Sequence, residues 1–217
     1  MLPDTPQLLL FIAAGWLLNL TPGPDVLYIV SNALKSGVRA GIVAALGIVS
    51  GCFVHVFAAA LGVGALLATS ATAFTVLKWA GAAYLVWMGV KLLLARGGSP
   101  LVPAADAAVR EPADLGRIFR RGFLTNVLNP KVALFFLAFV PQFIAPGSPD
   151  KVTTFLLLGL LFNLNSLPIN FGYAWLAGWA SQRVGAVQRT LHWLDRAAGA
   201  LFIGFGLKLA MSDNPAQ

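Results

Sequence analysis

An apolar run near the N-terminus is interrupted by Asn19-Leu20-Thr21-Pro22-Gly23-Pro24-Asp25. Two prolines and a glycine this close together cannot continue an ordinary α-helix, because proline lacks an N–H group and clashes with the preceding turn. The pattern instead predicts a new helix start, with Thr21 as the N-cap and Pro22 in the first helical position. A simple proline kink is the alternative.

The apolar runs around this stretch identify a membrane protein. The chain has 217 residues, of which 58% are hydrophobic and only 11% charged, whereas an average soluble domain has roughly 25% charged residues. A membrane-spanning helix needs about 20 mostly apolar residues. Six spans are predicted: Gln7–Val30, Ala40–Leu67, Ala73–Leu94, Arg121–Ile144, Val152–Trp179 and Thr190–Met211. We expect residues 1–217 to form one transmembrane domain, with the first run retained as a span.

The fourth predicted span has its own break, Asn126-Val127-Leu128-Asn129-Pro130-Lys131. Asn129 is a candidate N-cap, and Pro130 fits the first helical position. Spans one and four are therefore both expected to be broken in the middle of the membrane. The unpaired N–H groups and the positive dipole end of each half-helix would attract an anion such as a carboxylate.

The basic residues are distributed unequally between the predicted loops. Eleven of the 15 Lys and Arg residues follow spans one, three and five, whereas three lie on the opposite side. Because Lys and Arg stay on the cytoplasmic side, the odd-numbered loops are predicted to be cytoplasmic and both termini external. The net charge of +7 is thus explained by topology, and no nucleic-acid partner is expected.

The two halves of the chain resemble one another. Residues 80–92 and 197–209 share five identical positions at a constant offset, including a Gly-x-Lys-Leu ending. The halves, about 1–94 and 121–211, are joined by a predicted cytoplasmic loop at 95–120. Because each half has three spans, the second half enters the membrane from the opposite side, which gives the inverted repeat of many secondary transporters. A chance likeness between small-residue helices is the alternative.

Asp25 and Lys131 are charges placed inside predicted spans. A charge at the bilayer centre costs from about 2.5 kcal/mol upward, so neither is expected to face lipid. Together they would bind the two charges of a zwitterion. A structural role is the alternative for both, either as an ion pair or, for Asp25, as the stabiliser of its own helix start.

Other polar residues lie deep in predicted spans. His55 titrates in a range that suits proton transfer, although a hydrogen-bonded interior histidine explains it equally well. The fifth span contains Asn163, Asn165, Ser166 and Asn170. Contacts between helices and contacts to substrate both account for this cluster. Gly47 and Gly51 form a G-x-x-x-G pattern, which is a weak signal of close helix packing and would permit a homodimer.

The chain has no H-E-x-x-H, no P-loop and no nucleophile elbow, so we do not expect an enzyme. Its one cysteine, Cys52, cannot form a dithiol pair, and we expect no metal site and no cofactor. The alternative functions are a membrane redox carrier or a metal or ion transporter built on the same inverted three-helix plan. A scaffold without transport is a further alternative.

These motifs resemble those of the LysE/RhtB family of bacterial amino-acid exporters. The resemblance rests on the stretch from Asn19 to Asp25, on the glycine series Gly41, Gly47 and Gly51, and on the segments 77–85, 122–131 and 141–143. It covers nearly the whole chain.

The resemblance implies an inner-membrane secondary transporter that exports amino acids or close derivatives, of the homoserine, threonine or leucine type, by proton antiport. Its partners would be the amino acid, protons and the lipid bilayer. The family motifs and the polar cluster together give the expected substrate-binding residues: Thr21, Pro22, Gly23, Pro24, Asp25, Asn129, Pro130, Lys131, Asn163 and Asn165. Asp25 and His55 are the candidates for proton coupling.

Overall fold

The structure is a computed structural model that describes residues 3–69, 75–76, 79–80, 82–83, 86–87, 90, 93–94, 113–144, 150–180, 200, 203–204, 206–207 and 210–211. Its main helices are α1 (Thr5–Leu20), α2 (Pro24–Ser36), α3 (Val38–Thr69), α5 (Leu115–Val127), α6 (Pro130–Leu134) and α7 (Lys151–Ala180). A π-helical segment, η1 (Phe135–Phe139), and a 3₁₀ segment, η2 (Val140–Phe143), continue α6. The described residues contain no strand, which confirms the all-α prediction.

In the described part of the chain, two helices are long and apolar enough to cross a membrane, through Val38–Gly62 and Lys151–Trp179. A third span is present if Leu115–Val127 and Pro130–Phe143, which meet at a bend of 48°, are counted together. Helix α1 is apolar but shorter. The predicted spans at 73–94 and 190–211, and with them the repeated segments 80–92 and 197–209, lie largely outside the described residues.

The first break differs from the prediction in its capping. Helix α2 begins at Pro24 with Gly23 as its N-cap, so Thr21 and Pro22 do not start it. Thr21 instead ends α1, because both its hydroxyl group and its backbone N–H donate to the carbonyl oxygen of Leu17, at 2.6 and 3.0 Å. The Thr21 side chain is thus used at the end of α1, and α2 starts two residues later with Gly23 as its N-cap.

The second break is capped as predicted. Asn129 is the N-cap of α6, its side-chain oxygen accepts from the backbone N–H of Lys131 at 3.1 Å, and Pro130 is the first helical residue. Asp25 and Lys131 thus occupy the same position, directly after the first proline, in α2 and α6.

Helix α5 begins at Leu115, within the segment predicted to be a loop up to residue 120. Its N-cap is Asp114, whose carboxylate accepts from the backbone N–H of Arg117 at 2.9 Å. This hydrogen bond also holds the pKa of Asp114 below its ordinary value. The charged residues that suggested a loop are the exposed side of a helix, because a spanning helix can continue past the apolar layer.

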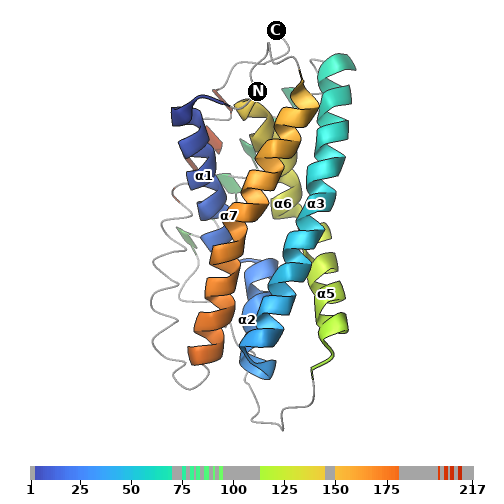
Figure 1. Cartoon of the computed structure of the whole chain (residues 1–217). Helices are drawn as coiled ribbons and strands as arrows, with labels where there is room; N and C mark the ends of the chain where they lie inside the picture. Colours follow the sequence, from blue (N-terminus) through green and yellow to red (C-terminus); the bar gives the residue numbers. More distant parts are fainter. Residues whose placement is uncertain are drawn as a thin grey trace.

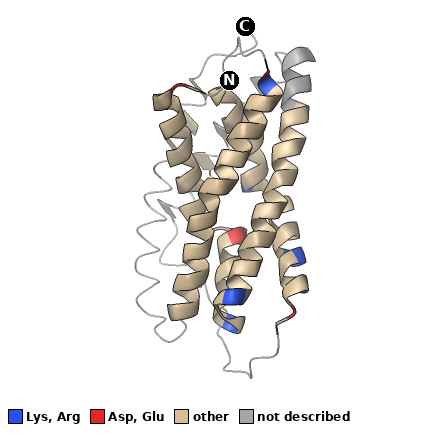
Figure 2. Cartoon of the chain, viewed as in Figure 1, with Lys and Arg blue, Asp and Glu red and all other residues tan. Residues whose placement is uncertain are grey.

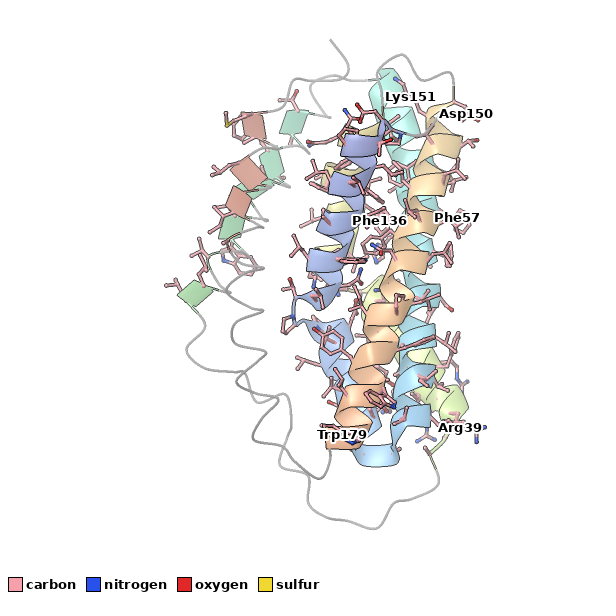
Figure 3. All side chains as sticks on the ribbon, turned by 60° about the vertical axis from the view of Figure 1, so that its left-hand side comes forward. Arg39, Phe57, Phe136, Asp150, Lys151 and Trp179 are labelled. Atoms are coloured by element: carbon pink, nitrogen blue, oxygen red, sulfur yellow. The ribbon has the colours of Figure 1, made fainter. Side chains whose placement is uncertain are left out.

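The helices form an elongated bundle (Figure 1) in which α1 and α7 begin at one end and α3 and α5 at the other. The broken pair α1–α2 therefore runs opposite to α5–α6, and α3 runs opposite to α7. Charged residues gather mainly at the two ends of the described helices (Figure 2). Arg39 and Trp179 lie at one end, and Asp150 and Lys151 at the other (Figure 3).

Glycines bring α3 against α5 at backbone distance. A Cβ atom on Gly47 would lie 2.3 Å from the carbonyl oxygen of Phe119, and one on Gly51 would lie 2.5 Å from that of Phe123. The predicted close packing at this G-x-x-x-G pattern is therefore real, and its partner is α5 of the same chain.

The core is different on the two sides of the breaks. One cluster is rich in phenylalanine and joins α1, η1 and α7 through Phe11, Phe135, Phe136, Phe155 and Phe162, all at most 3% exposed. The clusters beside α2 consist of smaller aliphatic residues from α2, α3 and α7. The two helix breaks lie between these packed regions.

Candidate functional site

The two helix breaks meet, because the side chain of Lys131 reaches from one to the other. Its ammonium group donates to the carbonyl oxygen of Thr21 at 2.9 Å, and Lys131 is a buried residue with an exposed fraction of 9%. A Cβ atom on Gly23 would lie 3.6 Å from the Lys131 Nζ atom. The lysine of α6 thus lies directly against the turn between α1 and α2.

This contact explains how a lysine is tolerated at the start of α6. A cation near a helix N-terminus opposes the dipole of that helix, but the same cation stabilises a helix C-terminus. The ammonium group of Lys131 lies at the C-terminal end of α1, where the last carbonyl groups have no partner within the helix. The neighbouring carbonyl oxygen of Leu20 accepts from the Tyr173 hydroxyl group at 2.8 Å.

Asp25 lies in the first turn of α2, where a negative charge favours the helix dipole. Its Oδ2 atom accepts from Asn126 Nδ2 of α5 at 2.8 Å. The carbonyl oxygen of Asn126 is also in contact with His55 Nε2, at 2.9 Å. Asn126 therefore joins the aspartate of α2 to the histidine of α3.

A cavity opens between these groups. It is lined by residues of α1, α2, α3, α5, α6 and α7 together with the turn at Gly23: Leu18, Asn19, Gly23, Asp25, Val26, Ile48, Val49, Cys52, Asn126, Lys131, Val132, Phe162, Asn163, Ser166 and Asn170. The space not filled by atoms, including its open part, is about 420 Å³.

Several polar atoms in the cavity lack a hydrogen-bond partner among the described residues. They are Asp25 Oδ1, Asn126 Oδ1, and both side-chain polar atoms of Asn163. A buried polar group without a partner costs about 1–3 kcal/mol, and more when it is charged. A bound molecule or ordered water would satisfy atoms of this kind.

Four of the expected site residues line the cavity: Gly23, Asp25, Lys131 and Asn163. The remaining residues of the two motifs form the turns around it, where Thr21 and Asn129 are buried. Asn165 points elsewhere, because its side chain accepts from the Trp16 indole and donates to the Ile12 carbonyl oxygen at 3.2 Å, both on α1. His55 reaches the site only through Asn126.

Ser166, Asn170 and Asn126 also line the cavity. None of them was among the expected substrate-binding residues, although Ser166 and Asn170 belong to the predicted polar cluster of the fifth span. Asn163, Ser166 and Asn170 are spaced three and four residues apart, which places them on one face of α7 and separates them from Asn165. This spacing by itself predicts that the three residues share a helix face that excludes Asn165. Asn126 belongs to the motif of the second break but had no predicted role, because its contact with Asp25 joins residues 101 positions apart. Cys52, expected to be a packing residue, is buried and also borders the cavity.

Comparison with known proteins places this site in a family. Residues 16–213 match the family described as LysE type translocator. The chain is 33% identical over 203 residues to the homoserine/homoserine lactone efflux protein of Salmonella typhimurium. This alignment covers 92% of the present chain and 94% of the relative. It is 29% identical to the leucine efflux protein of Salmonella choleraesuis, over 92% of each chain.

An uncharacterized membrane protein of Pseudomonas aeruginosa is 37% identical over 88% of each chain. No solved structure matches the chain. The family match covers both helix breaks and most of the chain, and the chain is therefore a membrane protein of the LysE type translocator family.

Proposed function

We propose that this protein is an inner-membrane secondary transporter that exports amino acids or close derivatives. Relatives that align over nearly their whole length are named efflux proteins for homoserine, homoserine lactone and leucine. We extend this substrate class to the present chain as neutral amino acids of the homoserine, threonine or leucine type, exported in exchange for protons.

The observation that carries the proposal is the group of unpartnered polar atoms around the cavity at the two helix breaks. Asp25 Oδ1, Asn126 Oδ1 and the Asn163 amide are buried without partners in the described residues, and the Lys131 ammonium group lines the same space. A negative and a positive side chain on one cavity match the two charges of a free amino acid.

The α-carboxylate would bind at the start of α2. Gly23 supplies no capping side chain to the first N–H groups of α2, whereas Asn129 does cap α6. The N-terminus of α2 therefore offers the positive end of its dipole to an anion. Lys131, close to Gly23, would add its charge to this position, and the absence of a side chain on Gly23 leaves room for the carboxylate.

The ammonium group of the substrate would pair with Asp25. Protonation of Asp25 from the outside would weaken this pairing and favour release of the substrate. Asp25 would then release the proton to the cytoplasm when the transporter returns to its inward-open state. Asn126 links Asp25 to His55, which supports a part for His55 in proton coupling. The hydrogen bond from His55 to Asn126 is equally consistent with an interior histidine that only holds α3 against α5.

Alternating access by two inverted halves is the proposed motion. It is supported by the opposite directions of α1–α2 and α5–α6 and of α3 and α7 (Figure 1). The residues Thr21–Asp25 and Asn129–Lys131 would lie at mid-membrane, with the arginine-rich ends of α3 and α5 in the cytoplasm. A homodimer remains a prediction, and Gly47 and Gly51 do not support it because they contact α5.

The rival functions, a redox carrier and a metal or ion transporter, have less support. In the part of the chain that the structure describes, no three His, Cys, Asp or Glu side chains are grouped to hold a metal ion. A dithiol relay needs two cysteines, and the sequence has one.

Efflux from proteoliposomes loaded with homoserine or leucine tests the proposal. We expect Asp25→Asn to lose proton-driven efflux by at least about 100-fold, because one positioned proton-transfer group contributes about 10²–10⁴. Asp150→Asn is the matched control, since Asp150 caps α7 through Thr153 at the end of the bundle and should keep wild-type rates. Wild-type efflux and proton coupling in Asp25→Asn would exclude the role of Asp25.

A further inference from the structure

Three buried side-chain oxygen atoms of cavity-lining residues have no hydrogen-bond partner among the described residues: Asp25 Oδ1, Asn126 Oδ1 and Asn163 Oδ1. Among the described residues, a single buried side-chain nitrogen, Asn163 Nδ2, also lacks a hydrogen-bond partner. Unpaired acceptors therefore outnumber unpaired donors. A ligand that satisfies this set must bring several N–H or O–H donors and at least one acceptor.

The orientation of the two amides supports this count. A carboxylate only accepts hydrogen bonds, so Asn126 must turn its NH₂ group toward Asp25, which leaves its Oδ1 atom as the outward acceptor. Both polar atoms of Asn163 lack a partner. Either orientation of that amide therefore presents one acceptor and one NH₂ donor.

Resting on the proposed function, we infer that Asp25, Asn126 and Asn163 form a subsite for the primary ammonium group of the substrate. A primary ammonium group has three N–H donors and no acceptor, which matches three oxygen acceptors, one of them charged. Asn163 Nδ2 then donates to the carbonyl or carboxyl oxygen next to the amine. The recognised unit is an α-amino carbonyl compound with an unmodified amine.

A bound metal cation such as Na⁺ is the competing ligand for three oxygens. The cavity disfavours it for two reasons. The Lys131 ammonium group lines the same space and repels a cation that brings no anion, and Asn163 Nδ2 is a donor that a metal ion cannot satisfy. A free α-amino acid answers both, because its carboxylate offsets the Lys131 charge and a carboxylate oxygen accepts from Asn163 Nδ2.

The subsite predicts strong selection against modified amines. An N-acetyl amine has one N–H and no positive charge, so it leaves buried acceptors unpaired and Asp25 without a counter-charge. A site built to hydrogen-bond a donor rejects analogues that lack it by about 10⁴–10⁵ in the most selective enzymes. We expect at least a 100-fold higher concentration of the N-acetyl form to be needed for the same occupancy.

Ligand-induced thermal stabilisation of the purified full chain measures this selection, because a ligand that binds the folded state raises the unfolding midpoint. Homoserine and leucine would each be compared as free amino acid, N-acetyl derivative and N,N,N-trimethyl derivative. Only the free amines should stabilise at low concentration. Uptake of the same compounds into proteoliposomes provides a second reading that does not depend on the stability change.

Asn163→Leu should raise the free-amine concentration needed by about 10-fold or more, as expected for loss of a hydrogen bond to a charged group. Asn32→Leu is the matched control. The Asn32 side chain donates to the Tyr28 carbonyl oxygen within α2 at 2.8 Å, away from the cavity, and this variant should bind amines like the wild type.

Equal stabilisation and equal transport of free and N-acetylated forms would overturn the ammonium subsite while leaving amino-acid export intact. Stabilisation by NaCl but not by choline chloride, with competition between Na⁺ and the amine, would assign the three oxygens to a metal cation. If none of the compounds is bound or transported, the proposed function itself fails.

Discussion

Lys131 shows how one residue serves both the fold and the proposed binding. Its ammonium group donates to the Thr21 carbonyl oxygen, so it ties the start of α6 to the end of α1. The same group lines the cavity beside Gly23. A lysine here offsets the negative end of α1 and remains positioned to meet a carboxylate.

These two roles are separable by measurement. In Lys131→Ala, stability should fall by about 1–3 kcal/mol, because the Thr21 carbonyl oxygen loses its donor. Affinity for a free amino acid should fall about 10-fold to 100-fold, while affinity for the corresponding amide, which has no carboxylate, should change less than about threefold. Thermal unfolding and competition binding report the two effects.

An equal loss of affinity for acid and amide would leave Lys131 only its capping role. Lys35→Ala is the control, because Lys35 lies exposed in the last turn of α2. It should change neither affinity.

Among the elements, the contact between α3 and α5 positions the site. Gly47 and Gly51 let the two backbones approach, and this approach brings His55 and Asn126 within hydrogen-bond distance. A side chain at either glycine would push α5 outward and move Asn126 away from Asp25.

Gly47→Ala should therefore lower stability by about 1–3 kcal/mol, the usual cost of overpacking. Gly62→Ala on the same helix should be neutral or stabilising by up to about 1 kcal/mol, since nothing lies within 4 Å of the added Cβ atom and alanine favours a helix over glycine. Unfolding midpoints of the two variants should move in opposite directions. Similar losses in both would mean that the α3–α5 contact is not close.

For the whole molecule, the arrangement of charges predicts its orientation in the membrane. The ends that carry Arg39 and Lys151 lie opposite one another (Figure 3). Residues Lys35, Arg39, Arg117, Arg120 and Arg121 flank the turn before α3 and the start of α5, whose first residues lie at the same end (Figure 1). That end should face the cytoplasm.

Labelling of single cysteines in spheroplasts checks this orientation, with the native Cys52 replaced by alanine. Thr5→Cys, at the start of α1, should react with a membrane-impermeant maleimide in intact spheroplasts. Gly116→Cys, exposed in the first turn of α5, should react only after lysis. The reverse pattern would contradict the predicted topology.

The two breaks and the helical class were readable from the sequence because their causes are local. Proline ends or starts a helix through its own ring and missing N–H group, and Asn129 caps the residue two positions later. The capping of α2 was misassigned for a reason that is also local: Thr21 has a choice between the turn before it and the turn after it, and sequence alone does not rank the two.

The cavity was decided by tertiary structure. Asn126 meets Asp25 because the glycine contacts of α3 hold α5 close, and Lys131 meets Thr21 because α6 packs against the end of α1. Sequence therefore determined an apolar helical chain with two helix starts and one charge at each. The packing of distant helices determined which polar atoms face one another, because a hydrogen bond between residues 101 or 110 positions apart depends on the position of every helix between them.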